Sequence, residues 1–163
     1  MRLIFFSISL LSLFISCKEI NNDNNSIQSD TQIAFKSFFG QDNISEIYHL
    51  DSLYSSEFQK WSDFVTLLNL FKEMCNDDDD HRIMISALFD KSNNIDIKKI
   101  PTLFNTAPII GRTKVLKTFI EKVFFSVESE FSSKEYKKDI EKILDSFNAL
   151  IYQLNARAKE ISF

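Results

Sequence analysis

Residues 132–161 decide the fold of this chain, and they read SSKEYKKDIEKILDSFNALIYQLNARAKEI. Apolar residues recur in this stretch every three or four positions, which is the period of an amphipathic α-helix. Ser132 and Glu135 have the spacing of a capping box at a helix start. About 29 residues give a helix of roughly 43 Å, which is long enough to be the spine of a bundle. Its apolar side comprises Tyr136, Ile140, Ile143, Phe147, Leu150, Leu154 and Ile161, with Leu144, Ile151 and Ala158 beside them.

Residues 56–75 predict a second helix, because apolar side chains recur at the same intervals from Phe58 and Trp61 onward. The stripe is wide, which indicates a helix packed on more than one side. Ser55 or Ser56 is the expected N-cap.

Two more helices are expected further along the chain. Residues 81–90 follow Asp80, whose carboxylate makes it a favourable N-cap. Residues 106–129 carry Pro108 in the first turn, a position that proline tolerates. The apolar face of this second segment comprises Val115, Leu116, Phe119, Ile120, Val123, Phe124 and Val127.

The remaining segments give weaker signals. Residues 31–39 and 42–51 each fit a short helix. Ile95 and Ile97 alternate with charged residues, which fits either a short strand or an extended loop. Pro101 disfavours helix for the residue before it.

The composition agrees with a helical domain. The 163 residues include 17 Phe but only 2 Gly and 2 Pro, which disfavours a turn-rich β-sandwich. The hydrophobic share of 44% and the charged share of 26% are typical of globular proteins. A net charge of −4 provides no basic excess for phosphates, which argues against nucleic acid as a partner. We therefore expect one all-α domain over residues 31–163, a bundle of about five or six helices.

The N-terminus has the features of an export signal. Arg2 precedes the apolar run LIFFSISLLSLFI at residues 3–15, which is too short to span a bilayer. Ser16 and Cys17 follow, and together these features resemble a bacterial lipoprotein signal peptide, with Phe14 where Leu is more usual. The resemblance implies that the first sixteen residues are removed and that Cys17 is acylated. An ordinary signal peptide with a chance Cys, or an uncleaved anchor, is the alternative.

Residues 18–30, KEINNDNNSIQSD, predict a flexible tether after the lipidated Cys17, since so polar a segment buries too little surface to become ordered. Its random-coil span is roughly 20 Å. The lipobox, the tether and the Ile-, Phe-, Lys- and Asn-rich helical body are similar to spirochaetal surface lipoproteins. This resemblance implies an outer-membrane lipoprotein, often surface-exposed, whose domain meets host molecules. It assigns no individual binding residue.

Carboxylates cluster at residues 77–80 and are followed by His81. Oxygen ligands of this kind suit hard cations. An EF-hand loop that starts at Asp78, however, would have Ile83 at the sixth position, where glycine is required. A loop that starts at Asp90 would have Pro101 at the twelfth position, where the bidentate Glu belongs. We expect a solvated loop between helices and no metal or cofactor.

No catalytic set is recognisable in the sequence. His49 and His81 adjoin neither a nucleophile elbow nor an HExxH pattern, so we expect surface or half-buried structural positions for both and no enzymatic activity.

Cys75 lies on an apolar stripe, which predicts a buried, inert thiol, with a covalent dimer as the alternative. Trp61 and the Phe rings are expected in the core rather than in a ligand cage. The basic residues at the start of the last helix are expected on a solvated face; they are Lys134, Lys137, Lys138 and Lys142.

These features predict a lipid-anchored, non-enzymatic interaction module that binds a host or envelope protein. Two alternatives remain open. One is a periplasmic structural or accessory lipoprotein. The other is a carrier of small apolar ligands between the helices.

Overall fold

In the computed structural model of the chain, residues 35–38, 49–75, 79–130 and 134–161 are described. These ranges hold five α-helices and no β-strand, which confirms the expected all-α bundle. The expected signal peptide, the lipidation site at Cys17, the tether and the capping residue Ser132 lie outside the described residues. The helices are α3 (Ser55–Gln59), α4 (Ser62–Met74), α5 (His81–Asn93), α6 (Ala107–Glu130) and α7 (Lys134–Ile161), and the 3₁₀ turns are η2 (Phe35–Phe38), η3 (Ser52–Tyr54), η4 (Ile97–Lys99) and η5 (Thr102–Phe104).

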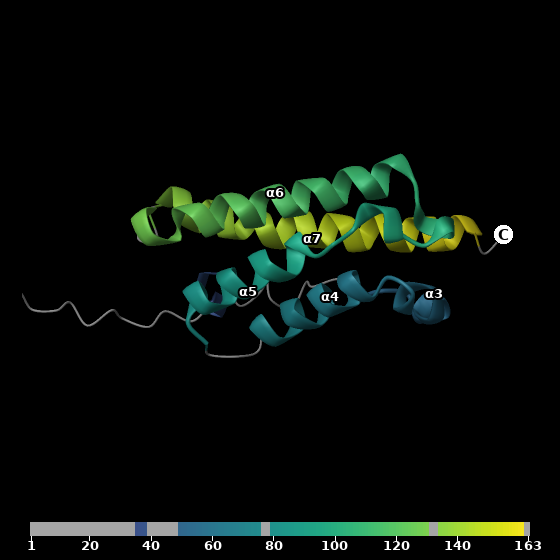
Figure 1. Ribbon diagram of the computed structural model, residues 1–163, viewed down its shortest axis with the longest axis horizontal. Helices are drawn as coiled ribbons and strands as arrows, with labels where there is room; N and C mark the ends of the chain where they lie inside the picture. The colour runs from purple at the N-terminus through teal and green to yellow at the C-terminus, as the bar shows by residue number, and fades with distance from the viewer. Residues whose placement is uncertain (1–34, 39–48, 76–78, 131–133, 162–163) are drawn as a thin grey trace, which may run out of the picture. The chain divides into compact units, whose positions relative to one another are not determined.

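The long C-terminal helix α7 is the spine of the domain. Its 28 residues extend over about 42 Å. It lies beside α6 along most of its length, while α4 and α5 cover the pair from one side (Figure 1). Its predicted apolar side is buried within this chain, except that Ile161 is half-buried. This apolar side of α7 therefore packs into the core of its own chain and is not available for pairing with another copy.

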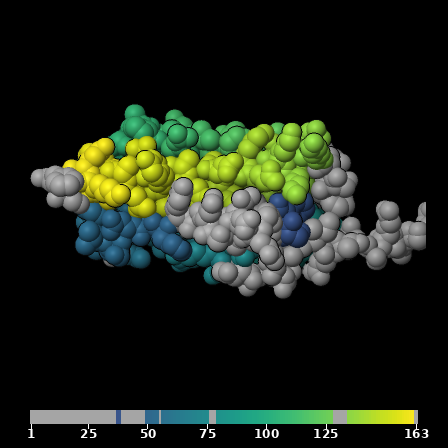
Figure 2. Space-filling view, turned by 180° about the vertical axis from the view of Figure 1, so that it is seen from behind, coloured from purple at the N-terminus to yellow at the C-terminus, as the bar shows by residue number. Residues whose placement is uncertain are grey.

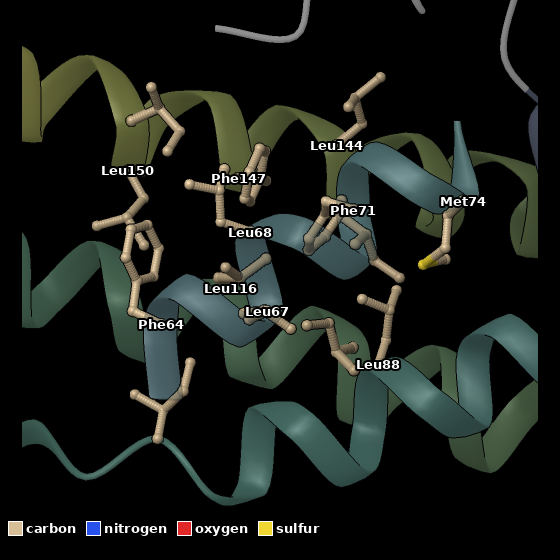
Figure 3. Packing of buried hydrophobic residues seen from close by; sticks show 14 of the residues in the cluster. Phe64, Leu67, Leu68, Phe71, Met74, Leu88, Leu116, Leu144, Phe147 and Leu150 are labelled. Carbon is tan, nitrogen blue, oxygen red and sulfur yellow. The ribbon is translucent and has the colours of Figure 1, made fainter. Parts of the chain in front are cut away.

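The wide stripe of α4 lies at the centre of the core. Figure 3 shows its side chains among those of the neighbouring helices. Phe71 stacks on Phe147 of α7, with ring centroids 4.1 Å apart. Met74 and Leu88 of α5 are also fully buried. The expectation of a helix packed on more than one side is thus confirmed. The buried residues of α4 are Phe64, Leu67, Leu68, Phe71 and Met74.

The predicted helix over residues 56–75 is wrong in one respect, because it is broken between α3 and α4. Trp61 leaves the helical conformation, with φ −99° and ψ 66°, and α3 begins at Ser55 without a side-chain cap. The break lets Phe58 reach Phe104 of η5 at 4.7 Å, while Trp61 stacks on Phe64 at 4.6 Å. Packing of these rings outweighs the local preference for a continuous helix.

Helix α5 starts behind Asp80, as predicted, and runs to Asn93. Of the two structures expected around Ile95, the strand is not found in the described residues, whereas Ile95 and Asp96 form a short loop, with Asp96 extended at φ −92° and ψ 114°. The turn η4 then begins at Ile97, and the Asp96 side chain accepts a hydrogen bond from the Lys98 N–H at 2.9 Å. Ile100, before Pro101, leaves the helical region with ψ 126°, as predicted.

The two short N-terminal helices are only partly described. The turn η2 lies within the first expected segment, residues 31–39. In the second expected segment, the described residues 49–51 have no regular structure, so the helix predicted there is wrong for them.

Helix α6 carries Pro108 in its first turn, as expected. Leu116, Ile120 and Val123 of its predicted face are fully buried. Val115, expected on the same face, is 42% exposed. One residue turns a helix by about 100°, so a neighbour of Leu116 lies at the edge of the face.

We predict that Phe147→Ala lowers the free energy of unfolding by about 3–5 kcal/mol, because it removes the ring stacked on Phe71 and leaves a cavity. Urea unfolding followed by circular dichroism measures the change. Lys138→Ala, on the exposed side of the same helix, is the control and should shift stability by no more than about 0.5 kcal/mol. A loss below about 1 kcal/mol for Phe147→Ala contradicts the central place of this contact.

Candidate functional site

Asp80, the last carboxylate of the acidic turn, caps helix α5. Asp80 is buried, and its Oδ1 accepts hydrogen bonds from the Arg82 N–H at 2.8 Å and from Nε at 3.1 Å. These bonds outweigh the effect of burial and lower the pKa of the Asp80 carboxyl. Asp79 is exposed, and residues 77–78 lie outside the described ranges. Over the residues that the structure describes, no three His, Cys, Asp or Glu side chains converge as a metal site requires.

The two histidines lie at opposite ends of the bundle. His49 is exposed, as expected. The expectation for His81 is wrong, because it is only 1% exposed and packs against Phe38 and Tyr136, with ring centroids 5.0 and 5.9 Å away. A helical signal for this burial exists in the sequence: His81 shares a face with the buried residues Ile85, Leu88 and Ser92.

Cys75 directly follows α4 and is buried, as expected. Burial raises the pKa of its thiol to about 11, so the reactive thiolate is scarce at neutral pH. The thiol forms no disulfide within the described ranges. Trp61, likewise, is buried in the core as expected.

A buried carboxylate joins α6 to α7, and the sequence pattern missed it. Asp139 lies in sequence among the lysines of the face that is expected to be solvated, yet it is buried. It pairs with Lys122 of α6 and, at 2.9 Å, with Lys142 of its own helix. Burial opposes ionisation of Asp139, but the two lysines outweigh it, so the pKa of the carboxyl is lowered. The other three lysines of the expected face, Lys134, Lys137 and Lys138, are exposed.

Two irregular segments are fastened to the last turns of α7. The side chain of Asn155 accepts from the Asp51 N–H at 2.9 Å and donates to the His49 carbonyl at 2.7 Å. Arg157 Nε donates to the carbonyl of Leu103 at 3.0 Å. Figure 2 shows the segment that includes η3 and α3, in blue, packed against the yellow C-terminal end of α7. None of these three bonds had a signal in the sequence, because they hold segments without periodicity.

Each of the two fastened segments carries an exposed leucine, Leu53 in η3 and Leu103 in η5. We call these two residues, together with Tyr54, the apolar tip. Leu53 is 79% exposed and Leu103 is 39% exposed. Half-buried Tyr54, the neighbour of Leu53 in sequence, contacts the buried ring of Phe104, the neighbour of Leu103, edge-on with centroids 6.0 Å apart. The tip thus presents apolar side chains on a backbone that the hydrogen bonds of Asn155 and Arg157 hold in place.

A second apolar feature lies where α5 meets α6. Phe89 stacks on Phe124 at 4.0 Å, and Phe125 meets both rings edge-on at 5.8 and 5.3 Å. Phe125 is 70% exposed, although its helix buries the opposite face. Large exposed apolar side chains mark contact sites when they gather in patches.

Among the hollows on the surface, two are lined by described residues. One, of about 300 Å³, lies between residues 50–59 and α4 and is lined by Phe58 and Leu68 as well as by Asn69 and Lys72. The other, of about 330 Å³, is lined by polar residues and by the ion pair between Lys99 and Asp63, 3.2 Å apart. Charged or amide groups line both hollows, which suits contact with a polar partner better than enclosure of an apolar ligand.

Comparison with known proteins adds no relative: no protein-family model, curated protein or solved structure matches this chain. Within the described ranges, no helix is both long and apolar enough to cross a membrane. The residues that can act at a site are therefore those that the geometry itself singles out, above all the apolar tip and the exposed Phe125.

We predict that the ion pairs of Asp139 make the free energy of unfolding depend on pH in the acid range. A carboxyl whose pKa is lowered by folding stabilises the fold above its unfolded pKa of about 3.9, and this contribution is lost as the pH falls through the folded value. Asp139→Asn should therefore lower the free energy of unfolding at pH 7 by about 1.5–3 kcal/mol. The difference from the unchanged chain should shrink below about pH 4.

Urea unfolding between pH 3 and 7 measures this difference. Asp145→Asn, exposed on the same helix, is the matched control and should show no such trend. A difference between Asp139→Asn and the unchanged chain that stays constant through the acid range contradicts the prediction.

Proposed function

We propose that this chain is a lipid-anchored lipoprotein of the bacterial outer membrane whose helical domain is a non-enzymatic interaction module. Cys17 carries the lipid, the following residues tether the domain, and the domain binds a host or envelope protein. The lipobox and the tether sequence support the anchoring part of the proposal. The apolar tip supports the binding part.

The position of the tip within the domain fits this role. The turn η2 is the described segment nearest to Cys17 along the chain, and its Phe38 packs against Tyr136 near the start of α7. The tip is fastened at Arg157, near the other end of the same helix. From Tyr136 to Arg157 helix α7 extends over about 32 Å. The turn η2 and the tip therefore lie near opposite ends of α7, which suits a domain that is tethered through its N-terminal side and binds through the tip.

The surroundings of the tip fit a protein partner. Charges of both signs accompany it: the ion pair of Lys60 with Glu57 follows Leu53 closely in sequence, and Arg157, which holds the Leu103 backbone, pairs with Glu160. An apolar centre with a polar rim is the usual arrangement of a protein–protein contact. The backbone beneath is held by Asn155 and Arg157, so little ordering entropy is lost when a partner binds.

We predict that the N-terminal peptide of the exported protein begins at an acylated Cys17. Acyl chains bury CH₂ groups worth about 0.8 kcal/mol each, so a multiply acylated chain partitions into the membrane fraction. Mass spectrometry of the N-terminal peptide measures the modification. Cys17→Ser is the control, in which the signal peptide should stay uncleaved and no acyl chain should be attached. An unmodified Cys17, or a chain that starts elsewhere, overturns the anchoring part.

We predict that the tip selects the partner. Full-length protein on intact cells should retain a component of host serum, matrix or envelope, and Leu53→Ser combined with Leu103→Ser should reduce retention at least tenfold, since each buried Leu contributes about 1.5–3 kcal/mol. Tyr152→Ser, which alters an exposed aromatic residue on the outer face of α7, is the matched control and should retain the component.

Surface proteolysis of the same cells distinguishes the two kinds of partner. Cleavage of the domain on intact cells favours a host protein, whereas complete protection favours an envelope protein. Equal retention by the tip variant and the unchanged chain contradicts the proposed role of the tip.

A further inference from the structure

The outer face of α6 carries a regular stripe that takes no part in the core formed by the described residues. Its six residues recur at alternating intervals of four and three, the spacing of a helix–helix seam. All six are exposed. They lie on the side of α6 opposite the buried residues Ile109, Leu116 and Ile120. The stripe consists of Ala107, Gly111, Lys114, Thr118, Glu121 and Phe125.

Phe125 is a projecting, fixed side chain at one end of this stripe. It is 70% exposed, yet the rings of Phe124 and Phe89 contact it edge-on and restrict its orientation. A restricted aromatic ring loses little conformational freedom when it is buried, which makes it an effective anchor in an interface.

Gly111 is a gap near the other end of the same stripe. A Cβ atom placed there would meet no atom within 4 Å, and the residue does not have a positive φ. Neither packing nor backbone conformation within the monomer therefore requires glycine at this position. Glycine is also a poor helix former. The space above it is open to a side chain from outside.

We propose that a second copy of this chain occupies the stripe, with the two α6 helices antiparallel and crossing at Thr118. Phe125 lies seven residues after Thr118 and Gly111 lies seven residues before it. In an antiparallel pair, Phe125 of each copy is thus opposite Gly111 of the other. The contact is isologous, as in most homodimers, so every favourable pair forms twice.

The charges of the stripe select the antiparallel arrangement. Lys114 and Glu121 are exposed and form no ion pair among the described residues. Antiparallel pairing brings Lys114 of one copy next to Glu121 of the other, on both sides of the crossing. Parallel pairing would instead set Lys114 against Lys114 and Glu121 against Glu121, which is repulsive. A single pair of crossing helices is a small interface, so the dimer forms in a concentration-dependent way.

Crosslinking of the full chain in the cells that produce it tests the proposal. In Thr118→Cys the two introduced thiols meet at the crossing point, and a short bismaleimide should join them into a species of twice the mass. Asp145→Cys, on the exposed side of α7, is the control and should remain monomeric. Buried Cys75 is present in both variants and does not distinguish them. Equal yields from the two variants overturn the proposal.

Second variants in the Thr118→Cys chain test the geometry. Gly111→Leu fills the gap and should lower the crosslink yield at least tenfold while the melting temperature stays equal or rises, because leucine is the better helix former. Lys114→Glu and Glu121→Lys should each lower the yield, and the two together should restore it. A yield unchanged by Gly111→Leu, or a double variant no better than the single ones, overturns the antiparallel pairing.

Discussion

Burial of one face of α7 is the constraint on which the rest of the structure depends. The face extends from Tyr136 to Ala158 and is covered by α6 and, in part, by side chains of α4. The stack of Phe71 on Phe147 places α4 against this face, and α5 then packs against both α4 and α6. A strongly amphipathic helix cannot leave its apolar side in water, so the shorter helices are arranged around it.

Polar contacts then fix what apolar burial leaves undetermined. Hydrophobic packing is non-directional and tolerates sliding of one helix along another. The Asp139 pair with Lys122 joins α6 and α7 at one register, and the Asn155 and Arg157 bonds locate two segments that have no period of their own. These directional contacts position the exposed Leu53 and Leu103, so the core and the surface are linked through a few polar residues.

The helices with long, regular periods were predictable, since burial and local preference agree over many turns of α6 and α7. The break at Trp61 was not, because it depends on Phe58 meeting Phe104, and periodicity does not encode contacts between distant segments. Burial of His81 was encoded by its spacing to Ile85 and Leu88, but the polar residue type concealed it. The apolar tip had no signal at all, since Leu53 and Leu103 lie in turns outside any stripe.

The Asn155 bonds also have a consequence for the order of assembly. They join the backbone at His49 and Asp51 to a helix more than a hundred residues further along the chain. Contacts of such high sequence separation form late, because a long loop must close first. The segment beneath Leu53 therefore acquires its final position only after α7 has docked. A chain that ended before Asn155 would form some of its helices but would not hold the apolar tip in place. The tip therefore takes its final form only in a completely folded chain.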